Sequence, residues 1–189
     1  MLVLASQSPR RAELLRNAGI PFVVRAAPVD ESTIAGETPA EYVKRLACAK
    51  AHAVAAAPHE IVLGADTTVV VDGEILAKPE DAADARRMLK LLSGRQHDVL
   101  TGICLKRGSS AMVEHTLTIV RFAPMTDAEI EEYVASGEPV DKAGAYGIQG
   151  RASKFVASIE GCFFNVVGLP VPVVYRRLME LQNRQVTEQ

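Results

Sequence analysis

The stretch at residues 61–71 restricts the fold of this chain more than any other feature of the sequence. It is almost wholly apolar or β-branched, and the dipeptide Asp72-Gly73 that follows it is favoured in two-residue hairpin turns. Such a run predicts a long strand buried on both faces. A strand of this kind needs a layer on each side, so we expect the chain to fold around a sheet that helices cover.

The turn also predicts the register of a hairpin. If Val71 pairs with Glu74, then Thr67 pairs with Lys78, and Asp66 lies beside that lysine. A carboxylate buried alone in an apolar strand is costly, so Asp66 needs a cation, a metal ion or hydrogen bonds. The convergence of Asp66 and Lys78 is therefore either a structural ion pair at the end of a sheet or part of a catalytic centre.

Three further residues join Asp66 in this pattern. Gly64 lies on the same face of the predicted strand and is expected to leave room for a ligand. Lys50 falls on the apolar stripe of the preceding helix, where it either extends its ammonium group to solvent or reaches a phosphate in a cleft. Glu31 lies in the loop before that helix and is either simply solvated or a carboxylate ligand.

A helix that begins with two arginines is predicted at residues 9–18. Ser8 is a good N-cap and Pro9 a good first helical residue. Arg10 and Arg11 then lie at the positive end of the helix dipole, which costs about 0.3–1 kcal/mol for each cation. A bound phosphate would remove this conflict, because backbone N–H groups, serine hydroxyls and both guanidinium groups would surround it. The alternative is a solvated arginine pair.

A loop at residues 144–150 carries glycine at every third position, next to Gln149. Glycine permits a positive φ and a close approach of the backbone. The amide of Gln149 offers a donor beside an acceptor, which could pair with one edge of a uracil or thymine ring, and Tyr146 could pack or stack there. The alternative is a tight turn in a β-rich corner.

The remaining sequence alternates strand and helix signals, which is typical of a mixed α/β fold. Capping boxes beginning at Thr38 and Thr126 each open a helix. Residues 141–168 are glycine-rich and expected to be irregular. The other strands are expected near residues 2–5, 21–25, 74–76, 99–105 and 113–122, and the other helices near residues 39–58, 80–92, 127–136 and 170–182.

The composition favours one domain over residues 1–189, with a frayed polar tail at residues 183–189. Hydrophobic residues make up 48% of the chain and charged residues 23%, which argues against disorder. The formal net charge of -2 gives no footprint for long nucleic acid or an anionic membrane. Three widely spaced cysteines, and no apolar run as long as a membrane span, favour a reduced, cytoplasmic protein.

Six motifs in fixed order resemble the Maf family, and the resemblance covers almost the entire chain. It implies a fold similar to that of the inosine triphosphate pyrophosphatases, with a mixed twisted sheet, flanking helices and two lobes around a cleft. It also implies a homodimer that hydrolyses nucleoside triphosphates, dTTP and UTP in this branch, to the monophosphate and diphosphate. The motifs are residues 6–11, 64–67, 76–79, 93–97, 143–150 and 165–170.

The same resemblance implies roles for individual residues. Asp66 would accept the proton of the attacking water, and Glu31 with Asp66 would hold a divalent cation, Mg²⁺ or Mn²⁺. Lys50 and Lys78 would complete the catalytic set by contacting the triphosphate.

Substrate binding would fall to a second set of residues. By the resemblance, Ser8 and Arg11 would contact the triphosphate, while Arg10, Thr67 and Gln149 would select the base.

The function has two alternatives. The protein could be an enzyme for 7-methyl-GTP or modified nucleotides instead of a dTTP/UTP pyrophosphatase, or a nucleotide-binding regulator of septum formation.

Overall fold

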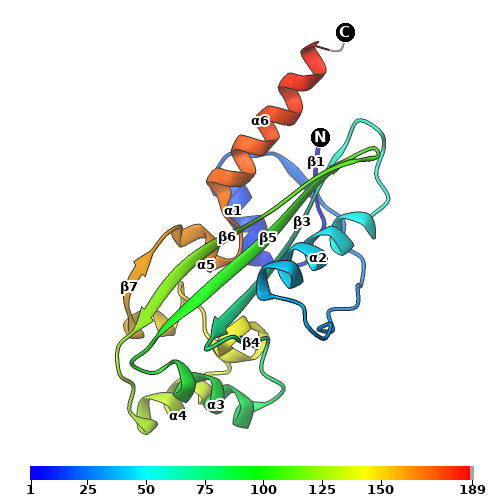
Figure 1. The fold of residues 1–189 in the computed structure, drawn as a ribbon. Helices are drawn as coiled ribbons and strands as arrows, with labels where there is room; N and C mark the ends of the chain where they lie inside the picture. Colours follow the sequence, from blue (N-terminus) through cyan, green and yellow to red (C-terminus); the bar gives the residue numbers. More distant parts are fainter. Residues whose placement is uncertain (188–189) are drawn as a thin grey trace. The chain divides into compact units, whose positions relative to one another are not determined.

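The computed structural model, which describes the backbone of residues 1–187, is a mixed α/β fold built on a seven-stranded sheet (Figure 1). The strands follow the order β2-β1-β3-β5-β6-β7, and β4 pairs with β3 off this path. The predicted fold class is confirmed. The strands are β1 (Leu2–Leu4), β2 (Phe22–Val24), β3 (Ile61–Val71), β4 (Glu74–Leu76), β5 (Gln96–Arg107), β6 (Ser110–Phe122) and β7 (Val156–Glu160).

Two helices begin at the capping boxes that the sequence predicted. Thr38 and Thr126 each accept a hydrogen bond from the third amide of their helix. The carboxylate of the glutamate at that third position accepts one from the threonine amide, so both capping boxes are confirmed. The α-helices are α1 (Pro9–Asn17), α2 (Pro39–His52), α3 (Ala82–Leu92), α4 (Asp127–Ala135), α5 (Phe163–Val167) and α6 (Val171–Thr187), with 3₁₀ turns η1 (Glu138–Asp141), η2 (Ala143–Ala145) and η3 (Arg151–Phe155).

Two helix ends differ from the prediction. α2 stops at His52 instead of continuing toward Pro58, because the following chain forms a turn in which the Glu60 carboxylate accepts a hydrogen bond from the Ala57 amide (2.9 Å). α6 continues to Thr187, past its predicted end near residue 182, while residues 188–189 of the predicted tail lie outside the described residues. Among residues 1–187, no helix is both long and apolar enough to cross a membrane.

The chain divides into two compact units. The first unit comprises Met1–Asp66, Thr101–Thr116 and the chain from Gly168 onward, and the second comprises Thr67–Leu100 and Leu117–Val167. Strands β3, β5 and β6 each contribute residues to both units. The division falls within β3 between Asp66 and Thr67, so neighbouring residues of one predicted motif belong to different units.

In the first unit, β1 runs parallel to both β2 and β3, and helix α2 lies against the sheet. A Cβ built on Gly64 would collide with the carbonyl oxygen of Ala47 in α2. The expectation that Gly64 leaves room for a ligand is therefore wrong, because the backbone of α2 fills that space. Gly102 of β5 meets the backbone of Val43 in the same way, so two glycines allow α2 to approach the strands closely.

In the second unit, the hairpin has the predicted turn but a shorter ladder. Val71 pairs with Glu74 as expected, and the ladder ends where Val69 pairs with Leu76. The predicted pairing of Thr67 with Lys78 is therefore wrong. The strand stops because the Ala77 carbonyl instead accepts a hydrogen bond from the Gly144 amide (3.2 Å), and Pro79 has no N–H to donate.

The region predicted to be irregular, residues 141–168, contains a strand and a helix. β7 pairs antiparallel with β6, with a register shift between Arg121 and Phe122. The short helix α5 follows, and Asn165 within it donates hydrogen bonds to the Val99 carbonyl and the Thr118 hydroxyl (both 3.0 Å). These long-range contacts, rather than local periodicity, hold the two elements.

Candidate active site

The first unit contains a buried acid paired with a lysine. Asp66, in β3, is only 7% exposed, and the Lys50 ammonium nitrogen lies 2.6 Å from its Oδ1. The same nitrogen lies 2.6 Å from Glu31 Oε1, so Lys50 bridges two carboxylates. The sequence predicted that Asp66 needs a cation, a metal ion or hydrogen bonds, and the structure supplies a cation, Lys50 of α2, within the first unit.

Helix α2 positions this cluster. Because the glycine in β3 lets α2 lie directly on the strand, Lys50 near the end of the helix reaches Asp66. Two side chains of α2 also hold the loop that carries Glu31. The Tyr42 hydroxyl donates to the Glu31 carbonyl (3.0 Å), and the Arg45 guanidinium donates to the Ser32 carbonyl (2.9 Å).

Burial sets the electrostatics of Asp66. Removal from water raises the pKa of this carboxyl group, and the positive charges of Lys50 and Arg11 oppose that shift. The negative charge of Glu31 adds a smaller raising effect. Burial lowers the pKa of Arg11, which remains charged, and raises the pKa of Tyr42 to about 12, so that hydroxyl keeps its proton at neutral pH. A carboxylate of this kind is a stronger base than an exposed aspartate.

The arginines at the start of α1 have different surroundings. Arg11 is buried, and its guanidinium donates to the Gly168 carbonyl (2.8 Å) and to the Ser6 hydroxyl (3.0 Å). Arg10 is half-buried in the first turn. Ser8 occupies the N-cap position with an extended backbone, but its side chain makes no capping hydrogen bond. The solvated arginine pair, the alternative reading of the sequence, does not describe Arg11.

The donor set of this cluster fits a hard divalent cation. Asp66 Oδ1 and Glu31 Oε1 are each 2.6 Å from the same nitrogen, so both oxygens point toward one place. Magnesium takes oxygen ligands, commonly one or two carboxylates, and completes its shell with water and phosphate oxygens. In the described part of the chain no three His, Cys, Asp or Glu residues gather to hold a metal, so water and substrate would have to supply the other ligands.

The other predicted site residues belong to the second unit. Thr67 is half-buried in β3, directly after Asp66. Lys78 is exposed in the bend after β4, and Gln149 is exposed in the turn at residues 148–150. Three of the predicted residues thus lie in the second unit, whereas Ser8, Arg10, Arg11, Glu31, Lys50 and Asp66 lie in the first.

Each glycine of the loop at residues 144–150 meets a neighbour. A Cβ on Gly144 would press on the Val69 side chain, one on Gly147 on the stem of Lys142, and one on Gly150 on the Glu138 carboxylate. Only Gly144 of the three has a positive φ, at 66°. The side chains that pack against these three positions would have to shift if a Cβ were added.

Tyr146 packs inside the protein instead of facing a ligand. Its ring lies edge-on to Phe122 and His97, with centroid distances of 4.7 and 5.4 Å. Its hydroxyl is 2.8 Å from His97 Nε2, and both residues are buried. No local pattern predicts this contact, since His97 and Tyr146 are far apart in the chain.

Sequence reasoning also missed Tyr42, which anchors the loop of Glu31. A signal was present, because Tyr42 precedes Lys50 by about two helical turns and so shares its face of α2. The sequence did not predict that Tyr42 anchors the loop of Glu31, because a buried tyrosine on an apolar helix stripe is usually a core residue.

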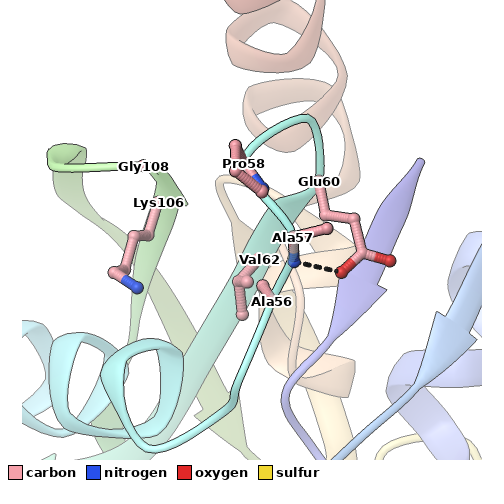
Figure 2. A pocket seen from close by; sticks show the side chains of 7 residues that line it. All are labelled: Ala56, Ala57, Pro58, Glu60, Val62, Lys106 and Gly108. Carbon is pink, nitrogen blue, oxygen red and sulfur yellow. Dashed lines mark hydrogen bonds between the residues drawn. The ribbon is translucent and has the colours of Figure 1, made fainter.

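A pocket elsewhere in the first unit involves none of the predicted site residues (Figure 2). Its carboxylate, on Glu60, already accepts from the Ala57 amide and pairs with Arg25 at 2.7 Å. The pocket therefore offers little for recognising a ligand. Its lining residues are Ala56, Ala57, Pro58, Glu60, Val62, Lys106 and Gly108.

The fold and the cluster around Asp66 define a mixed α/β protein with a buried, charge-paired carboxylate of the kind that enzymes use in general base catalysis. The chain belongs to the Maf family, since the model of the Maf-like proteins matches residues 1–181.

Relatives with named activities match nearly the whole chain. A dTTP/UTP pyrophosphatase of Symbiobacterium thermophilum is 60% identical over 171 residues, which cover 90% of this chain and 88% of the relative. One from Koribacter versatilis is 54% identical over 178 residues, with coverage of 94% and 92%. Among solved structures, the Ham1 protein of Staphylococcus aureus matches with a TM-score of 0.48 and 19% identity over 65% of this chain and 71% of that one.

Proposed function

We propose that this protein hydrolyses dTTP and UTP to the monophosphate and diphosphate. The observation that carries the proposal is the buried Asp66, with Lys50 at 2.6 Å and Glu31 on the same ammonium group. It is supported by the dTTP/UTP pyrophosphatases that are 60% and 54% identical to this chain.

In the proposed reaction, Asp66 accepts a proton from water, and the water oxygen forms a bond to the α-phosphorus. The bond from that phosphorus to the oxygen bridging to the β-phosphorus breaks, and diphosphate leaves with the bridging oxygen. Asp66 must be ionised for this step. Lys50 and Arg11 favour its ionised form, while burial makes the carboxylate more basic.

Cationic groups would bind the phosphates. Arg10 and Arg11, with Ser8 and the N–H groups at the start of α1, are suited to phosphate oxygens. Lys50 and Lys78 would offset the charge that develops on the diphosphate. Asp66 and Glu31 would hold Mg²⁺ or Mn²⁺, which supplies neutralisation of phosphate charge when bound.

Base selection would rest on Gln149, Thr67 and Arg10. The exposed amide of Gln149 can donate to one carbonyl oxygen of uracil or thymine and accept from the neighbouring N–H. We further propose that the protein acts in the cytoplasm as a homodimer. The three free cysteines suit a reducing compartment.

The test is release of diphosphate from dTTP, UTP, CTP, the purine triphosphates and 7-methyl-GTP, with Mg²⁺ or Mn²⁺ and with a chelator. We expect turnover of dTTP and UTP that falls about 10²–10⁴-fold in Asp66→Asn, because the general base is lost. Asp127→Asn, which changes an aspartate whose side chain is 81% exposed, is the matched control and should keep wild-type activity.

Each other outcome of this panel changes the proposal. Turnover of 7-methyl-GTP alone would keep the chemistry and overturn the choice of base. Near-normal activity of Asp66→Asn would remove Asp66 from its role. No turnover of any nucleotide by folded, metal-supplied protein would favour a nucleotide-binding regulator.

A further inference from the structure

Two side chains outside the predicted site hold the turn that carries Gln149. The Tyr133 hydroxyl, at the end of α4, accepts a hydrogen bond from the Gly147 amide (3.2 Å). The Glu138 carboxylate, in η1, accepts one from the Arg151 amide (3.0 Å). Gln149 therefore lies midway between two backbone amides that are both fixed from outside the turn.

The two holding side chains are also bonded to each other. The Tyr133 hydroxyl donates to Glu138 Oε1 (2.9 Å), while Glu138 Oε2 accepts the hydrogen bond from the Arg151 amide. Within the turn, the Gly150 amide donates to the Gly147 carbonyl (3.0 Å). We call Tyr133 and Glu138 the turn clamp, since together they fix both ends of one turn.

The packing around the turn clamp restricts the movement of the Tyr133 and Glu138 side chains. Tyr133 is 2% exposed, and its ring lies edge-on to Phe155 at 6.0 Å between centroids. A Cβ on Gly150 would meet the Glu138 carboxylate, so a larger residue there would displace that carboxylate. The Lys142 ammonium group donates to the Glu138 carbonyl (2.6 Å), which fixes the backbone of that residue. Burial also raises the pKa of Tyr133, so its hydroxyl keeps the proton that it donates.

We infer that Tyr133 and Glu138 are positioning residues that orient Gln149 and thereby set the selectivity for uracil and thymine over cytosine. This inference rests on the proposed function, in which Gln149 contacts the base. An exposed side chain takes its position from its own backbone, so the turn sets the distance and angle at which the Gln149 amide meets the base. A displaced turn would weaken the pair of hydrogen bonds to uracil or thymine, and the selectivity that rests on that pair would fall.

The experiment measures kcat and KM for UTP and CTP in Tyr133→Phe, Glu138→Ala and Glu138→Gln. We expect kcat/KM for UTP to fall about tenfold in the first two variants, mainly through KM, with the ratio of UTP to CTP falling with it. Glu138→Gln should recover part of the loss, because its amide oxygen can still accept from the Arg151 amide. Tyr175→Phe and Glu132→Ala, which alter an exposed hydroxyl and an exposed carboxylate, are matched controls.

Two further measurements separate positioning from a merely structural role. Hydrogen exchange should accelerate at the Gly147 amide in Tyr133→Phe and at the Arg151 amide in Glu138→Ala, whether or not the enzyme is active. In a Gln149→Ala background, Tyr133→Phe should cause no further loss of the UTP to CTP ratio.

The outcomes are distinct. An unchanged UTP to CTP ratio in folded variants of an active enzyme would overturn the inference and leave the proposed function intact. Equal losses of UTP and CTP turnover, or losses that persist unchanged without Gln149, would assign the turn clamp a structural role only. Wild-type protein that turns over no nucleotide would instead contradict the proposed function.

Discussion

Burial shifts the pKa values of two titratable residues of this protein in opposite directions. Asp66 is buried beside the cations Lys50 and Arg11, which keep its ionised form accessible although burial raises its pKa. His97 is buried among aromatic rings, and burial alone lowers its pKa to about 4. The first environment tolerates a charge and suits a base, whereas the second excludes a charge and suits a neutral hydrogen-bond partner for Tyr146.

The lowered pKa of His97 predicts how the stability of the folded chain depends on pH. The unfolded chain binds this proton with a pKa of 6.5, while the folded chain binds it only near pH 4. Stability is therefore complete above about pH 6.5 and is lost as the pH falls toward 4, by about 3 kcal/mol in total. Urea unfolding of wild type and His97→Gln between pH 7 and pH 4 measures this loss, which should be smaller in the variant.

A control variant and one contrary outcome test whether His97 causes the loss of stability in acid. His115→Gln changes an exposed histidine and should retain the wild-type dependence on pH. If His97→Gln lost stability with acid as steeply as wild type, the cause would lie in other groups, such as the paired carboxylates.

Among the elements of the fold, the contact of α2 with β3 decides whether the cluster of Asp66, Lys50 and Glu31 can form. Gly64→Ala would place a methyl group against the backbone of α2, which cannot move as a side chain can. We expect a loss of about 3 kcal/mol in the free energy of unfolding, the upper range for overpacking. Gly73→Ala is the control, because its φ of 81° causes strain but no atom lies within 4 Å of its Cβ, and it should cost about 1 kcal/mol.

Denaturant unfolding of both variants checks this prediction. A loss in Gly64→Ala no larger than in Gly73→Ala would show that α2 can shift without penalty. In that event the position of Lys50 would not depend on the close packing of the helix.

The same contact shows what the sequence could predict. Strand β3, its turn and both capping boxes were predicted correctly, because each depends on a few neighbouring residues. Asp66 and Lys50 were both identified, but their pairing was not, since it depends on packing between distant segments. β7 and α5 were missed for the same reason, as their sequences carry no periodicity that outweighs the glycines around them.

For the molecule as a whole, binding and stability are linked. A ligand that binds the folded chain and not the unfolded one stabilises it by about 2.7 kcal/mol at a concentration one hundred times its Kd. Asp66→Asn offers a way to measure this, because it should bind nucleotide without consuming it. With Mg²⁺ present, we expect dTTP and UTP to raise the Tm of this variant by about 5–10 °C, given the size of the chain.

CTP should raise the Tm less, and the difference between UTP and CTP should shrink when Gln149→Ala is added. Equal shifts with UTP and CTP would show that the base is not read in the bound state, so selectivity would have to arise during turnover. No shift with any triphosphate would mean that the folded chain binds none of them, and the cluster around Asp66 would then require another substrate.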